Sequence, residues 1–268
     1  MSGLVSADQR LVMGVEYDGG AFRGWQVQQG EARTVQGCVE QAIARVADHP
    51  VTVHCAGRTD AGVHALEQVI HFDTRAQRSE RSWVLGTNVN LPQDVRVRWV
   101  VPGAPGFHAR FSATARHYRY LILTRNTASA LLRDRVTWTH RALDQTRMRE
   151  AAVALVGEHD FTSFRAVACQ AKHPVRRVHY LEIAGDDTLC EIRVGANGFL
   201  QHMVRNIAGV LMAVGRGDRP VSWSAEVLAA RDRTSGGVTA PAGGLYFVRA
   251  DYPEEFVLPQ VAPMSPLV

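Results

Sequence analysis

The densest group of charged side chains in the sequence lies in a short segment punctuated by glycines, Gly57–Ala65 (GRTDAGVHA). Gly57 and Gly62 can adopt backbone angles that other residues avoid, so the segment can hold the carboxylate of Asp60 on a tight turn near Arg58. A fixed carboxylate is suited to act as a nucleophile or as a base. The same pattern also fits an Asx turn closed by an arginine, and this segment alone does not separate the two interpretations.

Alternating apolar residues flank the charged segment on both sides. Val51, Val53 and Cys55 alternate with polar neighbours before it, and Ile70 and Phe72 do so after it. This period of two is typical of half-buried strands. The pattern therefore predicts a strand, a loop bearing Asp60, and a second strand.

The first half of the chain follows the order β-α-β-β-α-β. Apolar alternation predicts a strand at 10–18, and Thr34 is the predicted N-cap of an amphipathic helix. The two strands that flank the charged segment come next, followed by a helix capped by Ser79 or Ser82 and a strand at 95–101.

The second half repeats this order less regularly, which indicates an α+β fold of two ferredoxin-like or RRM-like halves. Its predicted elements are a strand at 116–124, a helix from Asp144, a hairpin of 175–184 with 188–194, a helix over 200–214 and a strand from Leu245. We expect predominantly antiparallel sheets that flank a central cleft. Residues 1–106 would form the half that carries the catalytic loop, and residues 107–268 the half that completes the cleft.

Length and composition set broader limits. The chain has 268 residues, of which 46% are apolar, so it can bury one large core or two similar ones. No apolar run approaches the length of a membrane span, and residues 1–10 lack the apolar stretch of a secretory signal, so we expect a cytoplasmic protein with no membrane partner. The cysteines are scattered singly, which argues against a zinc site or a disulfide framework.

The basic residues are arginines except for Lys172, and the formal net charge is +4. Arginine suits bidentate contacts to phosphate and stacking on bases. Arginines recur on or near the predicted strands at Arg96, Arg98, Arg110, Arg116, Arg119, Arg176 and Arg177. They can follow a nucleic-acid backbone or form solvated strand faces, and the sequence leaves both interpretations open.

Several common catalytic signatures are missing from the sequence. It contains no GxxxxGK[ST] phosphate loop, no GxGxxG fingerprint, no HExxH pair and no GxSxG elbow. Nucleotide hydrolysis, nicotinamide chemistry and metal-dependent proteolysis are therefore disfavoured.

Seven segments follow one another in order over nearly the whole chain: YDGGAFRGWQVQ (17–28), TVQGCVEQAI (34–43), GRTDAGVHA (57–65), FHARFSATARHYRYLI (107–122), HDFTSFRA (159–166), FLQHMVRNIAGVL (199–211) and APAGGLYF (240–247). Together they resemble the TruA family of tRNA pseudouridine synthases. The resemblance implies an isomerase that converts uridine to pseudouridine at positions 38, 39 and 40 in the anticodon stem-loop of tRNA. It also implies a homodimer that needs neither a cofactor nor a metal.

The resemblance assigns roles to five residues. Asp60 matches the catalytic aspartate, and Arg205 matches an arginine that pairs with it in the family. Tyr118 matches the tyrosine that stacks on the target base, Leu245 an apolar residue packed against the uracil, and Arg58 the motif arginine that contacts bases and phosphates. One departure is His117, where many relatives have arginine, which puts a phosphate-binding role of that position in doubt.

The implied reaction explains why a carboxylate is needed. The N–C glycosidic bond breaks, the uracil turns, and a C–C bond forms between the same base and the same sugar, with no net oxidation. A carboxylate near the anomeric carbon can act as a nucleophile or as a base toward the ribose, and both routes remain open. Burial disfavours the charged carboxylate, so Asp60 requires a cationic partner, and Arg205 is the candidate.

Two other function classes fit the sequence less well. A non-catalytic RNA-binding protein made of tandem RRM-like units is disfavoured because the aromatic RNP strand pattern is missing. An enzyme acting on a free nucleoside or sugar is disfavoured because no second carboxylate lies in an evident partner motif. The proline-containing tail, residues 253–268, has no assigned role.

Overall fold

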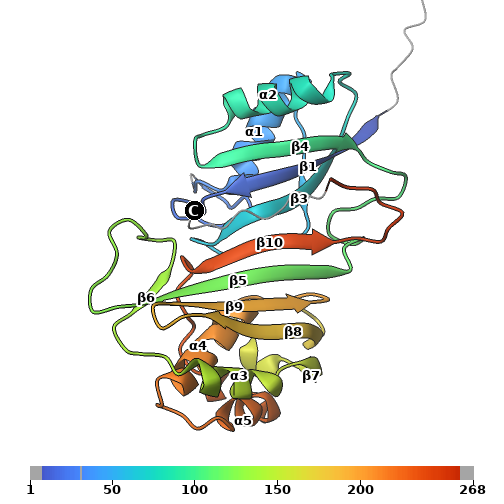
Figure 1. The fold of residues 1–268 in the computed structure, drawn as a ribbon. Helices are drawn as coiled ribbons and strands as arrows, with labels where there is room; N and C mark the ends of the chain where they lie inside the picture. Colours follow the sequence, from blue (N-terminus) through green and yellow to red (C-terminus); the bar gives the residue numbers. More distant parts are fainter. Residues whose placement is uncertain (1–7, 31, 260–268) are drawn as a thin grey trace, which may run out of the picture. The chain divides into compact units, whose positions relative to one another are not determined.

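The computed structural model describes residues 8–30 and 32–259, and the chain forms two compact units (Figure 1). The first unit contains the chain up to Thr114 together with the segment from Phe247 onward, and the second contains Ala115–Tyr246. The end of the unassigned tail, residues 260–268, lies outside the described residues. The division expected after residue 106 and the expected central cleft stay predictions.

The first unit has an antiparallel sheet with β1 (Gln9–Tyr17) at its centre. This strand pairs with β3 (His64–Thr74) on one side and β4 (Val95–Pro102) on the other, and β2 (His54–Cys55) pairs with β3. Strand residues such as Met13 and Ile70, which are partners in the ladder, are fully buried. Of the strand predicted at 51–55, before the charged segment, only the last two residues form β2 and pair with β3.

Two helices cover this sheet, α1 (Val35–Ala47) and α2 (Glu80–Asn90), and they also pack against each other. Thr34 Oγ1 accepts a hydrogen bond from the Gly37 N–H at 3.3 Å, so the predicted N-cap of α1 is confirmed. The cap of α2 is Ser79, whose Oγ accepts from the Ser82 N–H at 3.2 Å. Local side-chain chemistry thus fixes where both helices begin.

The strands of the second unit run in the order β5 (Ala115–Thr124), β9 (Leu189–Ala196), β8 (Val175–Gly185) and β7 (Gly157–Asp160). Neighbouring strands in this order are antiparallel, and β6 (Thr137–Thr139) adds a short parallel pairing to β5. The predicted hairpin is β8 with β9. The predicted α+β class with predominantly antiparallel sheets is confirmed.

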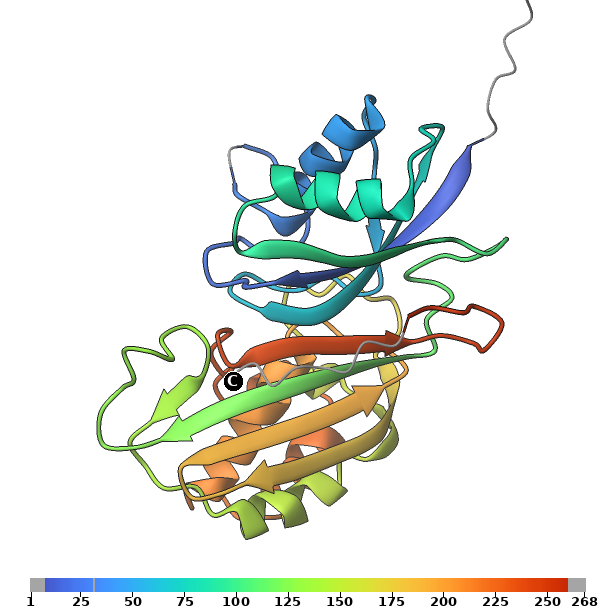
Figure 2. The ribbon, with the colours of Figure 1, turned by 45° about the horizontal axis from the view of Figure 1, so that its top comes forward.

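The helices of the second unit, α3 (Gln145–Val153), α4 (Met203–Gly215) and α5 (Trp223–Ala230), lie on one side of its sheet (Figure 2). Helix α3 begins next to Asp144, as predicted, and the Asp144 carboxylate caps it by accepting from the Arg147 N–H at 3.0 Å. Helix α4 begins later than its apolar stripe, because His202 has a left-handed φ of 64°. Short 3-10 turns at 162–164 and 233–235 complete the unit.

Strand β10 (Leu245–Asp251) leads the chain from the second unit back into the first. Beyond it, the Tyr252 hydroxyl donates to the Ala109 carbonyl oxygen at 2.7 Å. The rings of Tyr252 and Phe256 lie 5.1 and 5.3 Å from that of Phe107. The described part of the tail therefore packs within the first unit.

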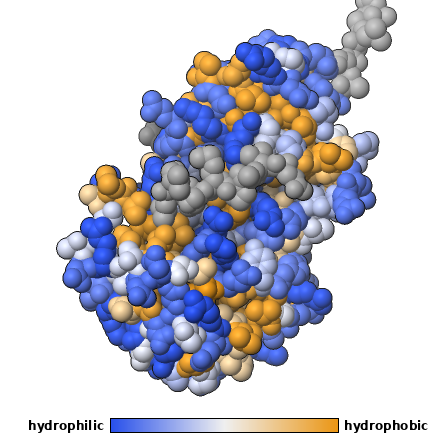
Figure 3. Space-filling view, in the orientation of Figure 1, coloured by the Kyte–Doolittle hydropathy of each residue, from blue (hydrophilic) through white to orange (hydrophobic). Residues whose placement is uncertain are grey.

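The surface is mostly polar on the face drawn in Figure 3, with apolar side chains in small groups. Large apolar side chains that are strongly exposed, such as Val89, Val167 and Val238, come from separate elements. Scattered apolar exposure of this kind is ordinary for a folded domain. None of the helices in the described ranges is long and apolar enough to cross a membrane.

Candidate active site

Asp60 lies in the loop between β2 and β3, which we call the acid loop (residues 56–63). Its side chain is half-buried, and Arg58 on the same loop is exposed. The Val63 N–H donates to the Asp60 carbonyl oxygen at 3.2 Å and closes the turn. At the start of the loop, Gln68 accepts from the Gly57 N–H at 3.2 Å and donates to its carbonyl oxygen at 2.5 Å.

The segment that follows β1, residues 18–25, holds the other side of the acid loop. The Trp25 N–H donates to the Thr59 carbonyl oxygen at 3.0 Å, and the Gly62 N–H donates to the Phe22 carbonyl oxygen at 3.3 Å. The hydroxyl groups of Tyr17 and Thr59 lie 2.7 Å apart and are both buried. Backbone and side-chain bonds thus join the residue before Asp60 to the end of β1 and the turn after it.

Two glycines let these two loops touch backbone to backbone. A Cβ at Gly24 would lie 2.8 Å from the Thr59 oxygen and 3.1 Å from the Asp60 carbonyl carbon, and Gly24 has a φ of +90°. A Cβ at Gly19 would lie 1.9 Å from the Val63 oxygen. Any side chain at these positions would push the acid loop away, so the two glycines determine where the Asp60 backbone lies.

The thiol nearest the acid loop is not a competing nucleophile. Burial raises the pKa of Cys55 to about 12, although the Arg58 guanidinium acts in the opposite direction. The thiol is therefore neutral at physiological pH, and a neutral thiol is a poor nucleophile. The acidic group that the acid loop offers for chemistry is the Asp60 carboxylate.

Arg205 lies on α4, a helix that is buried around nearly its whole circumference. Within α4, only Arg205 and Gly209 are not fully buried, and their i, i+4 spacing puts them on one face. A Cβ at Gly209 would lie 2.0 Å from the Val238 carbonyl oxygen, so a chain segment covers this face closely. Arg205 Nε donates to the Ala240 carbonyl oxygen at 2.8 Å, and the Ala240 N–H donates back to the Arg205 carbonyl oxygen at 3.1 Å.

The covering segment, residues 238–244, leads directly into Leu245. Tyr120 on β5 supports it: the buried Tyr120 hydroxyl donates to the Pro241 carbonyl oxygen at 2.9 Å and contacts Thr137 Oγ1. Burial raises the pKa of Tyr120, so the phenol stays neutral. The Leu121 N–H also donates to the Gly244 carbonyl oxygen at 2.8 Å. Tyr120 thus supports the segment 238–244, and packing of this kind is the commonest role of a tyrosine on a buried strand.

Tyr118 is buried on the same strand. Its ring meets that of Phe199 edge-on, with centroids 5.0 Å apart and an interplanar angle of 83°. Phe199 lies shortly before α4, so both Tyr118 and Arg205 are positioned by the segment 199–205. His117, in contrast, is buried, and its ring Nδ1 lies 2.8 Å from the Tyr180 hydroxyl, which makes it a packing residue.

The predicted site residues thus fall into two groups. Asp60 and Arg58 share the acid loop of the first unit, whereas Tyr118, Arg205 and Leu245 belong to connected segments of the second. Their assigned roles stay predictions. Sequence reasoning missed the supports Gly24, Gly209 and Tyr120, for which the only signals were a glycine-rich turn, a glycine within a helix and a strand tyrosine.

Three of the seven arginines that the sequence singled out, Arg98, Arg119 and Arg177, are paired with carboxylates. Arg98 lies 3.7 Å from Glu16 and 3.6 Å from Glu67. Arg119 lies 2.9 Å from Glu191. At these three positions the guanidinium is already paired within the protein, so these arginines do not form a continuous phosphate track.

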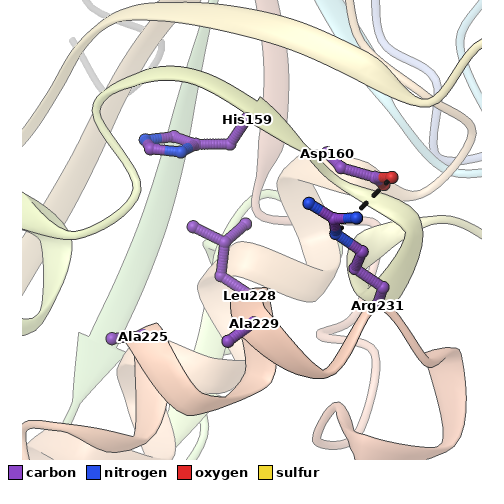
Figure 4. Close-up of a pocket in the computed structure, with 6 residues that line it drawn as sticks. All are labelled: His159, Asp160, Ala225, Leu228, Ala229 and Arg231. Carbon is purple, nitrogen blue, oxygen red and sulfur yellow. Dashed lines mark ion pairs between the residues drawn. The ribbon is translucent and has the colours of Figure 1, made fainter.

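A separate hollow of about 330 Å³ lies in the second unit between β7 and α5 (Figure 4). Its charged lining consists of His159, Asp160 and Arg231, and Asp160 Oδ2 lies 3.9 Å from Arg231 Nε. Burial would raise the pKa of Asp160, but hydrogen bonds from Thr162 and the charges of Arg231 and Arg165 hold it below its ordinary value. The carboxylate thus anchors a turn, and none of the predicted site residues lines the hollow.

No group of three or more histidine, cysteine, aspartate or glutamate side chains with the geometry of a metal site occurs in residues 8–30 and 32–259.

Comparison with known sequences identifies the class of enzyme. Residues 13–112 and 151–253 match a family model described as tRNA pseudouridine synthase. The chain belongs to this family of isomerases, which modify tRNA.

The curated relatives carry a more particular name, tRNA pseudouridine synthase A. The protein of this name from Methylococcus capsulatus is 59% identical over 93% of this chain and 92% of its own length. Those from Nitrosococcus oceani and Alcanivorax borkumensis are 57% and 55% identical, and cover 94% and 96% of this chain and 97% and 96% of their own lengths. The resemblance predicted from the seven segments is thereby confirmed at the level of the family.

Among solved structures, the archaeal box H/ACA sRNP Nop10-Cbf5 complex matches 75% of this chain with a TM-score of 0.35 and 15% identity. The match spans 44% of that chain. A Cbf5-Nop10-Gar1 complex gives a TM-score of 0.33 at 11% identity, over 88% of this chain and 57% of that one. Scores this low add nothing to the identification, which rests on the sequence matches.

Proposed function

We propose that this tRNA pseudouridine synthase modifies uridines 38, 39 and 40 in the anticodon stem-loop, with Asp60 as its catalytic residue. One observation carries the assignment of Asp60. The acid loop is held on both sides, by Gln68 on one side and by Gly19 and Gly24 on the other. Catalysis of bond breaking at a fixed sugar carbon requires a carboxylate held to within a fraction of an ångström, and such a loop supplies it.

The Asp60 carboxylate acts at the anomeric carbon of the target ribose. It serves either as a nucleophile that forms a covalent bond to the sugar or as a base that removes a ribose proton, and in both cases it stabilises positive charge as the N–C bond breaks. No electrons leave the substrate, since the uracil is detached and reattached through carbon. The displaced proton at uracil C5 is released to solvent.

The second unit supplies the remaining substrate-binding residues of the proposal. Tyr118 stacks on the target base, Leu245 packs against the uracil, and Arg205 balances negative charge in the reacting complex. Arg58 contacts the displaced or neighbouring nucleotides, since extruding a base from a stem costs a few kcal/mol that such contacts offset. Support comes from the hydrogen bonds that join the segment before Leu245 to Arg205, Tyr120 and Leu121.

Tritium release tests this assignment. Unmodified tRNA labelled with tritium at uracil C5 is incubated with the wild type and with Asp60→Asn. We expect release by the wild type only, with tRNA binding largely kept by the variant. Release by both proteins, or by neither, contradicts the catalytic role.

Substrate variants test the position. Replacing uridine by cytidine at 38, 39 and 40 in turn should remove the release due to each site, and replacing all three should abolish it. Release that persists in the triple variant contradicts the proposed positions. Turnover of free uridine at a rate similar to that of tRNA would instead revive an enzyme acting on nucleosides.

We infer a homodimer from the family resemblance, and we propose the cytoplasmic compartment that the sequence led us to expect. Sedimentation of the purified protein with and without tRNA tests the oligomeric state, and a monomer under both conditions contradicts it. Cell fractionation tests the compartment.

A further inference from the structure

Arg176, near the start of β8, is a half-buried cation that has no carboxylate partner within residues 8–30 and 32–259. Its Nη1 donates to the carbonyl oxygens of His173 at 2.9 Å and Val175 at 2.6 Å, both of them neutral acceptors. Among the described residues, no ion pair includes Arg176. Its neighbour Arg177 is exposed and forms the usual pair, with Nη2 3.2 Å from Glu158 Oε2.

The environment of Arg176 leaves its charge only partly compensated. Burial lowers the pKa of the guanidinium, and the nearby Cys169 thiol opposes this shift. Arginine nevertheless stays charged throughout the physiological range. A desolvated cation of this kind gains stability from an anion brought to it, because buried charges are favourable only when paired.

The guanidinium also keeps one edge available for a ligand. Both of these hydrogen bonds use Nη1, and Nε and Nη2 make no hydrogen bond within the described residues. Gly198 faces this edge: even a Cβ there would lie 3.7 Å from Nε, and glycine leaves the space without a side chain. Two parallel N–H donors suit the bidentate binding of a phosphate.

The turn at residues 197–199, beside Arg176, contacts Tyr118 through Phe199. Asn197 fixes it, accepting from the Arg177 N–H through Oδ1 at 3.0 Å and donating its own N–H to the Arg177 carbonyl oxygen at 3.1 Å. A second guanidinium reaches the same turn, since Arg116 Nη1 donates to the Asn197 carbonyl oxygen at 3.1 Å. Phe199, next but one after Asn197, packs edge-on against Tyr118.

We propose that Arg176 binds a backbone phosphate of the RNA substrate that flanks the nucleotide engaged by Tyr118. The inference rests on the proposed function, in which Tyr118 stacks on the target base. A phosphate next to that nucleotide lies within reach of a cation beside the Phe199 turn, and it supplies the anion that Arg176 lacks. The contact positions the RNA and carries no base specificity.

The test compares Arg176→Gln with the matched control Arg177→Gln, which removes the same charge one residue away. Binding of unmodified tRNA is measured over a range of salt concentrations. For Arg176→Gln we expect affinity to fall by about tenfold and the slope of log Kd against log salt to decrease by about one, since one phosphate contact is lost. Arg177→Gln should stay within about twofold with its slope unchanged, because its guanidinium is already paired.

A modified substrate locates the contact. A neutral methylphosphonate at one phosphate flanking the target uridine should weaken binding by the wild type but not by Arg176→Gln. Equal losses for both proteins at every flanking phosphate overturn the inference. So does an Arg176→Gln variant with wild-type affinity and salt slope but a lower Tm, which would show that the arginine only closes the turn at 173–175.

Tritium release by the wild type separates this inference from the proposed function. If the wild type releases tritium and Arg176→Gln binds tRNA normally, only the phosphate contact is wrong. If the wild type releases none from any tRNA, the proposed function itself fails.

Discussion

The acid loop of the first unit and the segment 238–244 of the second are both held by a glycine and a tyrosine, but the two glycines act for different reasons. Gly24 has a left-handed φ of +90° and touches the backbone of residues 59–61. Gly209 lies within α4 and is needed only because Val238 approaches it. At Gly24 both the left-handed φ and a steric clash exclude other residues, whereas at Gly209 only the steric clash does.

The tyrosines differ in what they support. The Tyr17 hydroxyl meets the Thr59 hydroxyl, a group that can rotate toward another partner, whereas Tyr120 donates to the fixed carbonyl oxygen of Pro241. Burial raises the pKa of both phenols, so both stay neutral. The loop bearing the proposed catalytic residue thus depends mainly on backbone contact, and the segment of the second unit depends more on a side-chain bond.

The largest expected effect is that of Gly24→Ala. Its methyl group would meet the backbone around Asp60, and a displacement of the carboxylate by about 1 Å can cost on the order of 100-fold in rate. We expect a loss of this size in the rate of pseudouridine formation. The matched control is Gly30→Ala, since Gly30 has the same φ of +90° but nothing within 4 Å of a Cβ.

Comparison of the two variants separates backbone strain from displacement of the loop. Gly30→Ala should keep its rate within about twofold and lose only the strain energy, about 1 kcal/mol. Equal losses in the two variants would show that strain alone matters and that the contact with the acid loop does not.

The next effect is that of Gly209→Ala on stability. Replacing glycine by alanine in a helix ordinarily gains about 1 kcal/mol. Here the methyl group would lie 2.0 Å from the Val238 oxygen, so we expect a net loss of about 1–3 kcal/mol in the free energy of unfolding, measured by urea titration. Gly86→Ala in α2 is the control, because its methyl group would meet only the Val46 side chain. A stabilised Gly209→Ala protein would show that segment 238–240 moves aside easily.

The smallest expected effect is the difference in stability between the Tyr120→Phe and Tyr17→Phe variants. Removing the Tyr120 hydroxyl leaves the Pro241 carbonyl oxygen without this donor, at a cost of about 1–3 kcal/mol for a buried group. Removing the Tyr17 hydroxyl should cost about 1 kcal/mol or less, since the Thr59 hydroxyl can reorient. Thermal unfolding checks the order, and a greater loss for Tyr17→Phe would reverse the comparison of the two tyrosines.

Features set by neighbouring residues could be predicted from the sequence. The cap Thr34 and the start of a helix at Asp144 were predicted because a polar side chain that accepts from an N–H three residues later acts locally. Helix α5 was not, since its buried face includes Ser224, whose hydroxyl donates to the Ala151 carbonyl oxygen of another helix. Its packing depends on a contact distant in sequence, which periodicity does not detect.

The candidate site shows the same limit. The composition of residues 57–65 pointed to Asp60 but left an Asx turn open, and the family resemblance decided between them. Gly24 appeared only as part of a glycine-rich turn, because its role lies in the approach of another loop. The residues proposed to act chemically were thus predictable from the sequence, whereas those that hold them in place were not.

The path of β10 bears on how the protein folds during synthesis. Chains emerge from the ribosome N-terminus first, and domains tend to fold as they emerge. The second unit is continuous in sequence and can complete its contacts on its own, whereas the first unit still lacks the segment from Phe247 onward when the second is finished. A nascent chain that stalls before Phe247 therefore carries the whole acid loop, yet it lacks most of β10 and the rings of Tyr252 and Phe256, which pack against Phe107.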